Sequence, residues 1–93
     1  MNYKEELGNK TWSFLHTFFR GIPEKISKRN EVLIKKFIKY LAKLYPCREC
    51  QQVFLNYIEE YDIDYSKKAQ IIKYFIEFHN FINIKLNKPL FLN

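Results

Sequence analysis

Large apolar residues near the C-terminal end of this chain recur with the period of an α-helix. They are separated by four, three, four and four residues, at Ile71, Phe75, Phe78, Ile82 and Leu86. Because 3.6 residues complete a helical turn, these side chains form one stripe along a helix from about Lys67 to Leu86. No segment of the sequence alternates apolar and polar residues as a strand does, which predicts an all-α fold.

Three earlier segments carry the same kind of pattern. We expect helices from about Lys10 to Phe19, from Ser27 or Asn30 to Leu44, and from Pro46 to Tyr61. Proline is tolerated in the first turn of a helix, where its missing N–H would have no partner, so we place Pro46 at the start of the third helix.

The ends of the fourth helix are also marked in the sequence. Asp64 or Ser66 is a suitable cap for its first turn. At the other end, Asn87 tolerates the left-handed conformation of a C-terminal cap, and Pro89 prevents the helix from continuing.

The composition fits one helical domain. Of the 93 residues, 47% are apolar and 18% are aromatic, and only two glycines and three prolines interrupt the pattern. A chain of this length buries one core but not a second. We therefore expect residues 1–93 to form a single domain, a four-helix bundle with short connections.

The formal net charge of +6 is spread over all the predicted helices. No basic run is interleaved with aromatic residues, so the sequence does not predict a nucleic-acid-binding face, and we expect no nucleic-acid partner. Residues 1–8 lack the apolar centre of a secretion signal, and no stretch reaches the roughly 18 apolar residues of a membrane span. We therefore expect a protein that is not secreted through a signal peptide and that has no membrane span.

The two cysteines, Cys47 and Cys50, are three residues apart at the predicted start of the third helix. The free N–H groups and dipole of a helix N-terminus favour a thiolate, so at least one of the two thiols should have a lowered pKa. A bridge across so short a loop removes little chain entropy, which favours a redox role over a structural one.

A single Cys-x-x-Cys pair is compatible with other chemistry. With His16 and His79 it would supply four zinc ligands for a helical interaction module, although the spacing matches no compact zinc motif. A basic helical nucleic-acid binder is a further alternative. A thioredoxin-like fold needs strands, which this sequence does not predict.

Two predicted helices each carry a pair of ring-bearing or polar side chains on one face. Trp12 and His16 are four residues apart in the first helix, as are His79 and Asn83 in the fourth. Such side chains suit a planar aromatic ligand, and Lys85 and Lys88 nearby suit an anionic group such as a diphosphate. A flavin would also accept electrons from a thiol pair.

Three segments together resemble the Erv/ALR sulfhydryl oxidases. Residues 8–16 resemble the family's Gly-x-x-x-Trp-x-x-Leu-His, and residues 45–50 resemble its Tyr-Pro-Cys-x-x-Cys. Residues 79–89 resemble its His-Asn-x-Val-Asn-x-Lys-Leu-Gly-Lys-Pro. The three motifs occur in the family's order and span about Gly8 to Phe91.

The resemblance implies a four-helix bundle with a short extra helix, FAD bound at one end, and a homodimer. It implies that Cys50 lies against the flavin and that Cys47 is attacked by the substrate thiolate. The cofactor site that it implies consists of Gly8, Asn9, Lys10, Trp12, His16, Tyr45, His79, Asn80, Asn83, Lys85 and Lys88.

The activity implied by the resemblance is disulfide formation in a dithiol protein or a relay thiol protein. Electrons would pass from Cys47 and Cys50 through FAD to oxygen, giving hydrogen peroxide, or to another acceptor. The corresponding locations are the mitochondrial intermembrane space, a reduced mitochondrion, or the cytoplasm of a virus-infected cell.

The sequence departs from the family pattern at two positions that bear on the site. Asn9 stands where the family usually has Arg, followed by Lys10, and a point charge does not replace a bidentate guanidinium without loss. Asn87 stands where the family has Gly, a change that the left-handed conformation tolerates.

Overall fold

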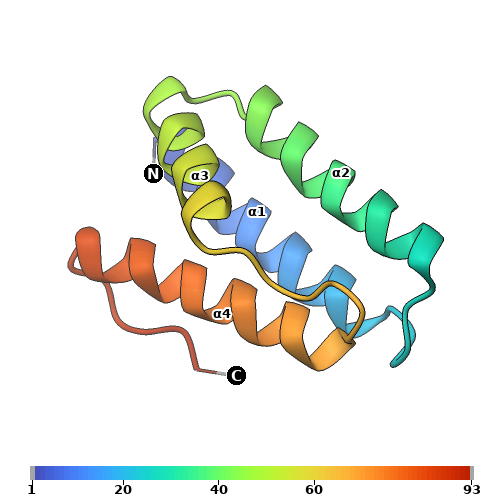
Figure 1. The fold of residues 1–93 in the computed structure, drawn as a ribbon. Coiled ribbons are helices and arrows are strands. Elements are labelled where there is room, and N and C mark those ends of the chain that lie inside the picture. The colour runs from blue at the N-terminus through green and yellow to red at the C-terminus, as the bar shows by residue number, and fades with distance from the viewer. Residues whose placement is uncertain (1, 93) are drawn as a thin grey trace.

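The computed structural model describes residues 2–92, which form four helices (Figure 1). They are α1 (Tyr3–Arg20), α2 (Lys28–Leu44), α3 (Arg48–Glu60) and α4 (Lys68–Lys85). Across these residues the only β-type pairing is an isolated bridge between Lys25 and Lys67. The predicted all-α fold is therefore confirmed.

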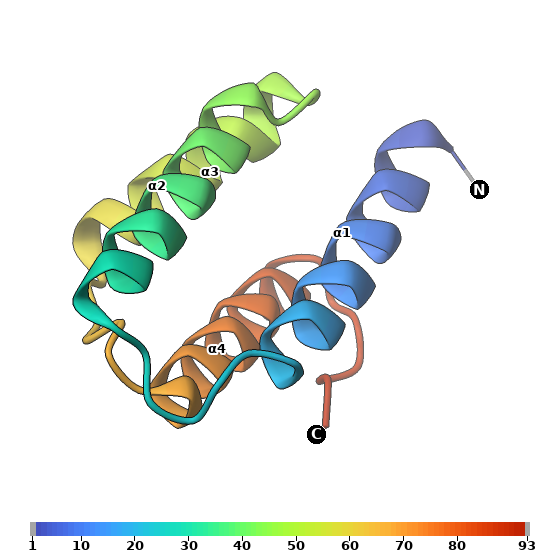
Figure 2. The same cartoon turned by 90° about the vertical axis from the view of Figure 1, so that its right-hand side faces the viewer.

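The helices pack as two pairs. Helix α1 lies against α4 and helix α2 lies against α3, so the molecule has two layers when viewed from the side (Figure 2). No helix described within residues 2–92 combines the length and apolarity needed to cross a membrane.

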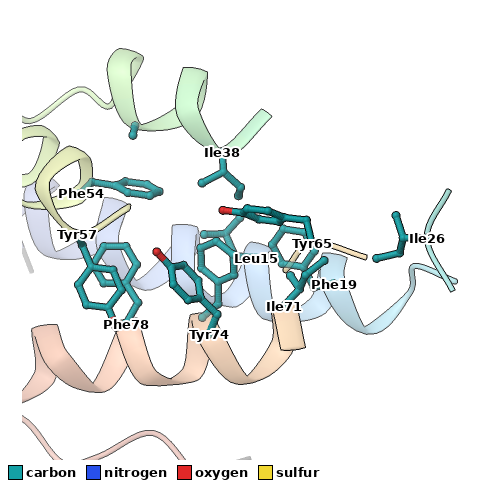
Figure 3. Close-up of a cluster of buried hydrophobic side chains, with 12 residues drawn as sticks. Leu15, Phe19, Ile26, Ile38, Phe54, Tyr57, Tyr65, Ile71, Tyr74 and Phe78 are labelled. Carbon is teal, nitrogen blue, oxygen red and sulfur yellow. The ribbon is translucent and has the colours of Figure 1, made fainter. Parts of the chain in front are cut away.

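The core between the layers is largely aromatic (Figure 3). The Phe78 ring of α4 stacks on Tyr57 of α3, with ring centroids 4.1 Å apart, and meets Phe54 edge-on at 5.2 Å. Trp12 of α1 contacts the same ring at 5.1 Å. Phe78 therefore joins three helices at the end of the bundle that carries the cysteines, and its burial there fixes how α1, α3 and α4 approach one another.

Helix α1 begins at Tyr3. The apolar pattern had predicted a later start, at about Lys10. Asn2 caps the additional turns, because its Oδ1 accepts the N–H of Glu5 at 2.8 Å. The first turn also carries two acidic residues, Glu5 and Glu6, whose negative charges interact favourably with the positive end of the helix dipole. The extension places Lys4 on the same helix as Trp12.

Helices α2 and α3 begin differently. Ser27 caps α2, with its Oγ 3.1 Å from the N–H of Asn30, as predicted. In α3 the cap is Cys47 itself, and the helix begins at Arg48. Pro46 therefore precedes the helix and does not occupy its first turn, which corrects the prediction from sequence.

Helix α4 also differs at its start. Its N-cap is Lys67, which makes no side-chain capping bond, whereas Asp64 accepts the N–H of Ser66 at 2.9 Å and closes the preceding turn. The prediction that Asp64 or Ser66 caps this helix is therefore wrong. Asp64 pairs with the nearer N–H of the turn, so its carboxylate is not free for the helix.

The C-terminal end of α4 confirms the left-handed Asn87, which has a φ of 55°. Its N–H donates to Ile84 O at 3.2 Å, and the Lys88 N–H donates to Asn83 O at 2.8 Å, which is the Schellman pattern. Residues 86–92 then form a turn and an extended segment. Within residues 86–92 the structure shows no short extra helix of the kind that the family resemblance implies.

Candidate functional site

A pocket of about 570 Å³ opens between α1, α3 and α4. Its walls combine aromatic and aliphatic side chains with a few amides and lysines, as is usual for small-molecule sites of this size. The lining residues are Asn2, Lys4, Glu5, Gly8, Asn9, Thr11, Trp12, Leu15, Tyr45, Glu49, Cys50, Val53, Phe54, Phe78, His79, Ile82, Asn83, Lys85, Leu86 and Lys88.

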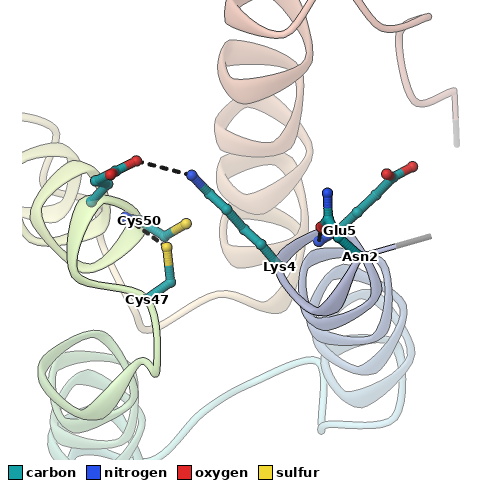
Figure 4. A network of polar contacts seen from close by, with 6 residues as sticks. Asn2, Lys4, Glu5, Cys47 and Cys50 are labelled. Atoms are coloured by element: carbon teal, nitrogen blue, oxygen red, sulfur yellow. Dashed lines mark hydrogen bonds and ion pairs between the residues drawn. The ribbon is translucent and has the colours of Figure 1, made fainter.

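The cysteine pair lies at the N-terminal end of α3 (Figure 4). Both cysteines are free thiols, and the N–H of Cys50 donates to the Cys47 sulfur at 3.4 Å. Cys50 lines the pocket, whereas Cys47 does not. The two sulfurs thus have different surroundings, one facing the pocket and the other lying outside it.

The two thiols also differ in acidity. The Cys50 thiol donates to the Cys47 sulfur, which lowers the pKa of Cys47, and the Cys50 N–H adds to this effect. Burial, followed by the neighbouring Cys47, raises the pKa of Cys50 to about 11. The expected thiolate is therefore at Cys47.

Tyr45 connects the cysteine loop to α1. Its hydroxyl donates to Thr11 Oγ1 at 3.1 Å, and the Thr11 hydroxyl donates to Leu7 O at 2.8 Å. The Tyr45 carbonyl accepts the Cys47 N–H at 2.8 Å. One tyrosine thus positions the cysteine loop through its backbone and holds the pocket wall through its side chain.

Four rings are stacked beside the pocket. Trp12 stacks on His79, with ring centroids 4.4 Å apart and planes 11° apart. His16 stacks on Phe91 at 4.2 Å and 2°. The two histidines are joined by a hydrogen bond of 3.0 Å between His16 Nε2 and His79 Nδ1. The predicted pairing of Trp12 with His16 on one face extends in the structure to rings from α4 and the C-terminal segment.

Both histidines are held in the neutral form. Burial lowers the pKa of His79 to about 4, with further repulsion from His16 and Lys88. Burial and then Arg20 lower the pKa of His16. A neutral His79 imidazole presents an uncharged ring at the pocket wall.

Asn80 holds the C-terminal segment in place. Its Nδ2 donates to Phe91 O at 3.1 Å, and its Oδ1 accepts the Phe91 N–H at 2.6 Å. Asn83, which is buried, donates to Asn80 Oδ1 at 3.3 Å. Asn83 lines the pocket, whereas Asn80 does not line it and reaches it only through its hydrogen bond with Asn83.

Most of the residues predicted from sequence converge on this pocket. Its lining includes Gly8, Asn9, Trp12, Tyr45, Cys50, His79, Asn83, Lys85 and Lys88. Four others are outside the lining: Cys47, Lys10, His16 and Asn80. Cys47, His16 and Asn80 each contact a lining residue, while Lys10 is exposed on α1.

Sequence reasoning did not identify several lining residues, including Lys4, Thr11 and Glu49. Thr11 and Glu49 lie inside the recognised motifs but were treated as their variable positions. Lys4 lies before the first motif, in turns of α1 that the apolar pattern had not predicted. The Asn2 cap was the available signal for those turns.

The four-ligand zinc site is not assembled. Within residues 2–92 no group of three or more His, Cys, Asp or Glu side chains is placed to hold a metal ion. His16 and His79 bond to each other, and the cysteines interact mutually.

The fold and the site define a class of protein: an all-helical domain whose Cys-x-x-Cys pair borders an aromatic, lysine-bearing pocket. The Erv1 / Alr family model matches residues 9–93, and the chain belongs to that family.

Proteins from a plant and from a virus are similar to the chain. "FAD-linked sulfhydryl oxidase ERV1" of Arabidopsis thaliana is 32% identical over 88 residues, covering 95% of this chain and 46% of that protein. "Putative FAD-linked sulfhydryl oxidase 096R" of Invertebrate iridescent virus 3 is 37% identical over 84 residues, covering 88% and 57%. The chain thus spans about half the length of these relatives, and further relatives include mitochondrial proteins of fungi.

The fold also matches a solved structure. The crystal structure of the FAD binding domain of Erv1 from Saccharomyces cerevisiae superposes with a TM-score of 0.92 at 28% sequence identity. The match covers 99% of this chain and 88% of that one.

Proposed function

We propose that residues 1–93 act as one FAD-dependent thiol oxidase domain that forms disulfide bonds in dithiol proteins or in a relay thiol protein. Met1 and Asn93 lie outside the described residues. One observation carries the proposal: Cys50 lines the same pocket as the stacked Trp12 and His79. A redox thiol and a surface for a planar ring therefore share one cavity.

The pocket residues fit a flavin dinucleotide. Trp12 and His79 offer ring faces, and Asn83 offers an amide at the pocket wall. Lys85 and Lys88 would attract the diphosphate, and Asn9, which also lines the pocket, takes the place of the family's Arg. A bound flavin would supply a two-electron acceptor for the thiol pair, and the electrons would go on to oxygen, giving hydrogen peroxide, or to another acceptor.

The cysteine pair carries out the exchange with the substrate. A substrate thiolate attacks the Cys47 sulfur of the disulfide, the Cys47–Cys50 bond breaks, and its electron pair stays on Cys50. A second substrate thiolate then attacks the substrate sulfur of this mixed disulfide and releases Cys47. The substrate gains one disulfide, and the Cys47–Cys50 disulfide becomes a dithiol.

The unequal positions of the sulfurs support these roles. Cys47 lies outside the pocket, where an incoming protein thiol reaches it, and its lowered pKa makes it the better leaving group in the second step. Cys50 faces the pocket, where electrons leave the pair.

The absorbance spectrum of the purified protein tests the proposal. We expect a yellow protein with flavin bands that takes up oxygen when a dithiol is added. Cys50→Ser should keep the colour and lose dithiol oxidation. A colourless preparation with stoichiometric zinc would overturn the proposal.

A homodimer is part of the proposal. Phe14 and Phe18 of α1 and Leu33 and Tyr40 of α2 are all large, apolar and exposed. Phe18 also contacts Phe37 of α2 at 5.5 Å, so the two helices share one apolar surface. A second copy of the chain would cover it. Phe18→Glu should shift the sedimentation coefficient from dimer to monomer, whereas an unchanged value would exclude this surface.

The proposed locations follow the relatives, which include mitochondrial and viral proteins. Both the mitochondrial intermembrane space and the cytoplasm of an infected cell remain part of the proposal. Fractionation of cells that express the tagged chain distinguishes them.

A further inference from the structure

Lys4 links the N-terminal end of α1 to the cysteine helix. Its Nζ donates to Glu49 Oε2 at 3.0 Å, across 45 residues of sequence. Figure 4 shows the Lys4 side chain extending from α1 toward α3, past the two sulfurs. Lys4, Glu49 and Cys50 all line the pocket.

This ion pair contributes little to folding stability. The side chains of Lys4 and Glu49 are 56% and 85% exposed, and solvent screens such pairs strongly. The position of the ion pair matters more than its strength. Glu49 lies between Cys47 and Cys50 in sequence, so the ion pair places one positive and one negative charge near the two sulfurs.

The charges around the sulfurs come from a few groups. Lys4 belongs to α1, Glu49 is in α3, and Tyr45, an uncharged hydroxyl at neutral pH, is the C-cap of α2. Of these, Lys4 lowers the pKa of both cysteines and Glu49 raises it. Glu49 and then Cys50 raise the pKa of Lys4 itself, which keeps its ammonium charged.

We infer that Lys4 is a positioning residue that stabilises the thiolate leaving from Cys50 when substrate attacks Cys47, and that Glu49 opposes it. The inference rests on the proposed function, because it concerns the first exchange step. In that step the substrate–Cys47 bond forms, the Cys47–Cys50 bond breaks, and the electron pair goes to Cys50. Cys50 is the less exposed sulfur, so its new negative charge most needs a nearby cation.

The test isolates Cys50 in a Cys47→Ser background and follows its alkylation by iodoacetamide from pH 7 to 10, where Lys4 keeps its charge. The titration midpoint is obtained by comparing each rate with that of a fully ionised model thiol. Lys4→Met should raise the titration midpoint by about half a pH unit, as expected for one charge screened by solvent. Glu49→Gln should lower it by a similar amount, and Lys4→Arg should leave it near the parent value. Lys28→Met is the matched control, because it removes the same charge at the far end of α2 and should have no effect.

A second measurement uses the intact pair. In glutathione buffers at pH 9, where the Cys47 thiolate is populated, Lys4→Met should shift the equilibrium toward the disulfide by up to about threefold, because the reduced form loses thiolate stabilisation. Equal midpoints in Lys4→Met and Lys28→Met, or shifts of the same sign in Lys4→Met and Glu49→Gln, would overturn the inference. Neither measurement needs flavin turnover, so a colourless and inactive protein would contradict the proposed function while the titration still tests Lys4.

Discussion

His16 and His79 share one hydrogen bond, with Nε2 of the first 3.0 Å from Nδ1 of the second. One of these nitrogens must donate and the other must accept, so the bond requires at least one neutral ring to offer a lone pair. Trp12 and Phe91 cover the outer faces of the two imidazoles. Protonation of both rings would place two positive charges side by side in this stack.

The first prediction concerns the dependence of stability on pH. The folded-state pKa of His79 is about 4, below the unfolded value of about 6.5, so the unfolded chain binds the proton first. Stability is therefore complete above about pH 6.5 and falls as the pH drops toward 4. We expect a loss of about 1 to 2 kcal/mol after solvent screening. Urea unfolding at pH 7 and pH 5 measures it, and His79→Gln should flatten the difference. A flat parent profile contradicts the prediction.

The second prediction concerns the hold of Asn80 on the C-terminal segment. Asn80→Ala removes both hydrogen bonds to the Phe91 backbone and should cost about 1 to 3 kcal/mol. The freed segment should become a preferred site for proteases. Asn80→Asp keeps the acceptor and loses only the donor, so it serves as the graded control. Thermal unfolding and limited proteolysis are the measurements. If Asn80→Ala resists proteolysis as well as the parent protein does, the two hydrogen bonds from Asn80 to Phe91 do not hold the segment in place.

The third prediction concerns the order in which the thiols react. Cys47 has the lowered pKa, whereas the pKa of Cys50 is about 11. In the reduced protein at pH 7.5, iodoacetamide should label Cys47 at least about tenfold faster than Cys50. Peptide mass spectrometry after short labelling times separates the two sites. Preferential labelling of Cys50 would reverse the assignment of outer and inner sulfur.

The fourth prediction concerns Asn87, which has a φ of 55°. Asn87→Gly should stabilise the protein or leave it unchanged, because glycine adopts this conformation without a steric cost. Asn87→Ala should destabilise it by about 1 kcal/mol. Chemical denaturation compares the two variants, and an alanine variant as stable as the glycine one would argue against the left-handed cap.

The sequence predicted some features that depend only on neighbouring residues. Ser27 caps α2 and Asn87 adopts the left-handed conformation, both as expected. Each of these features involves only backbone groups a few residues away. The start of α1 was missed because its first turns are polar, and Asn2 rather than an apolar stripe supports them.

The sequence motifs did not predict features that depend on contacts between distant parts of the chain. The resemblance placed Asn80 at the cofactor, while in the structure its amide bonds to Phe91, and that pairing depends on how residues 86–92 fold back. The Lys4–Glu49 ion pair needs α1 and α3 to be set side by side, which no local pattern encodes. The ring-bearing faces of the first and fourth helices predicted a planar ligand that accepts electrons from the thiol pair, and the family resemblance added that Cys50 is the sulfur beside it.

The indole of Trp12 has a practical consequence for experiments, because it is the only tryptophan among the 93 residues. It lies in the pocket wall, stacked on His79. Its fluorescence therefore comes from a single position and should respond when a ligand enters or when the imidazole gains a proton. The chain carries an intrinsic optical probe at the place where its chemistry is expected.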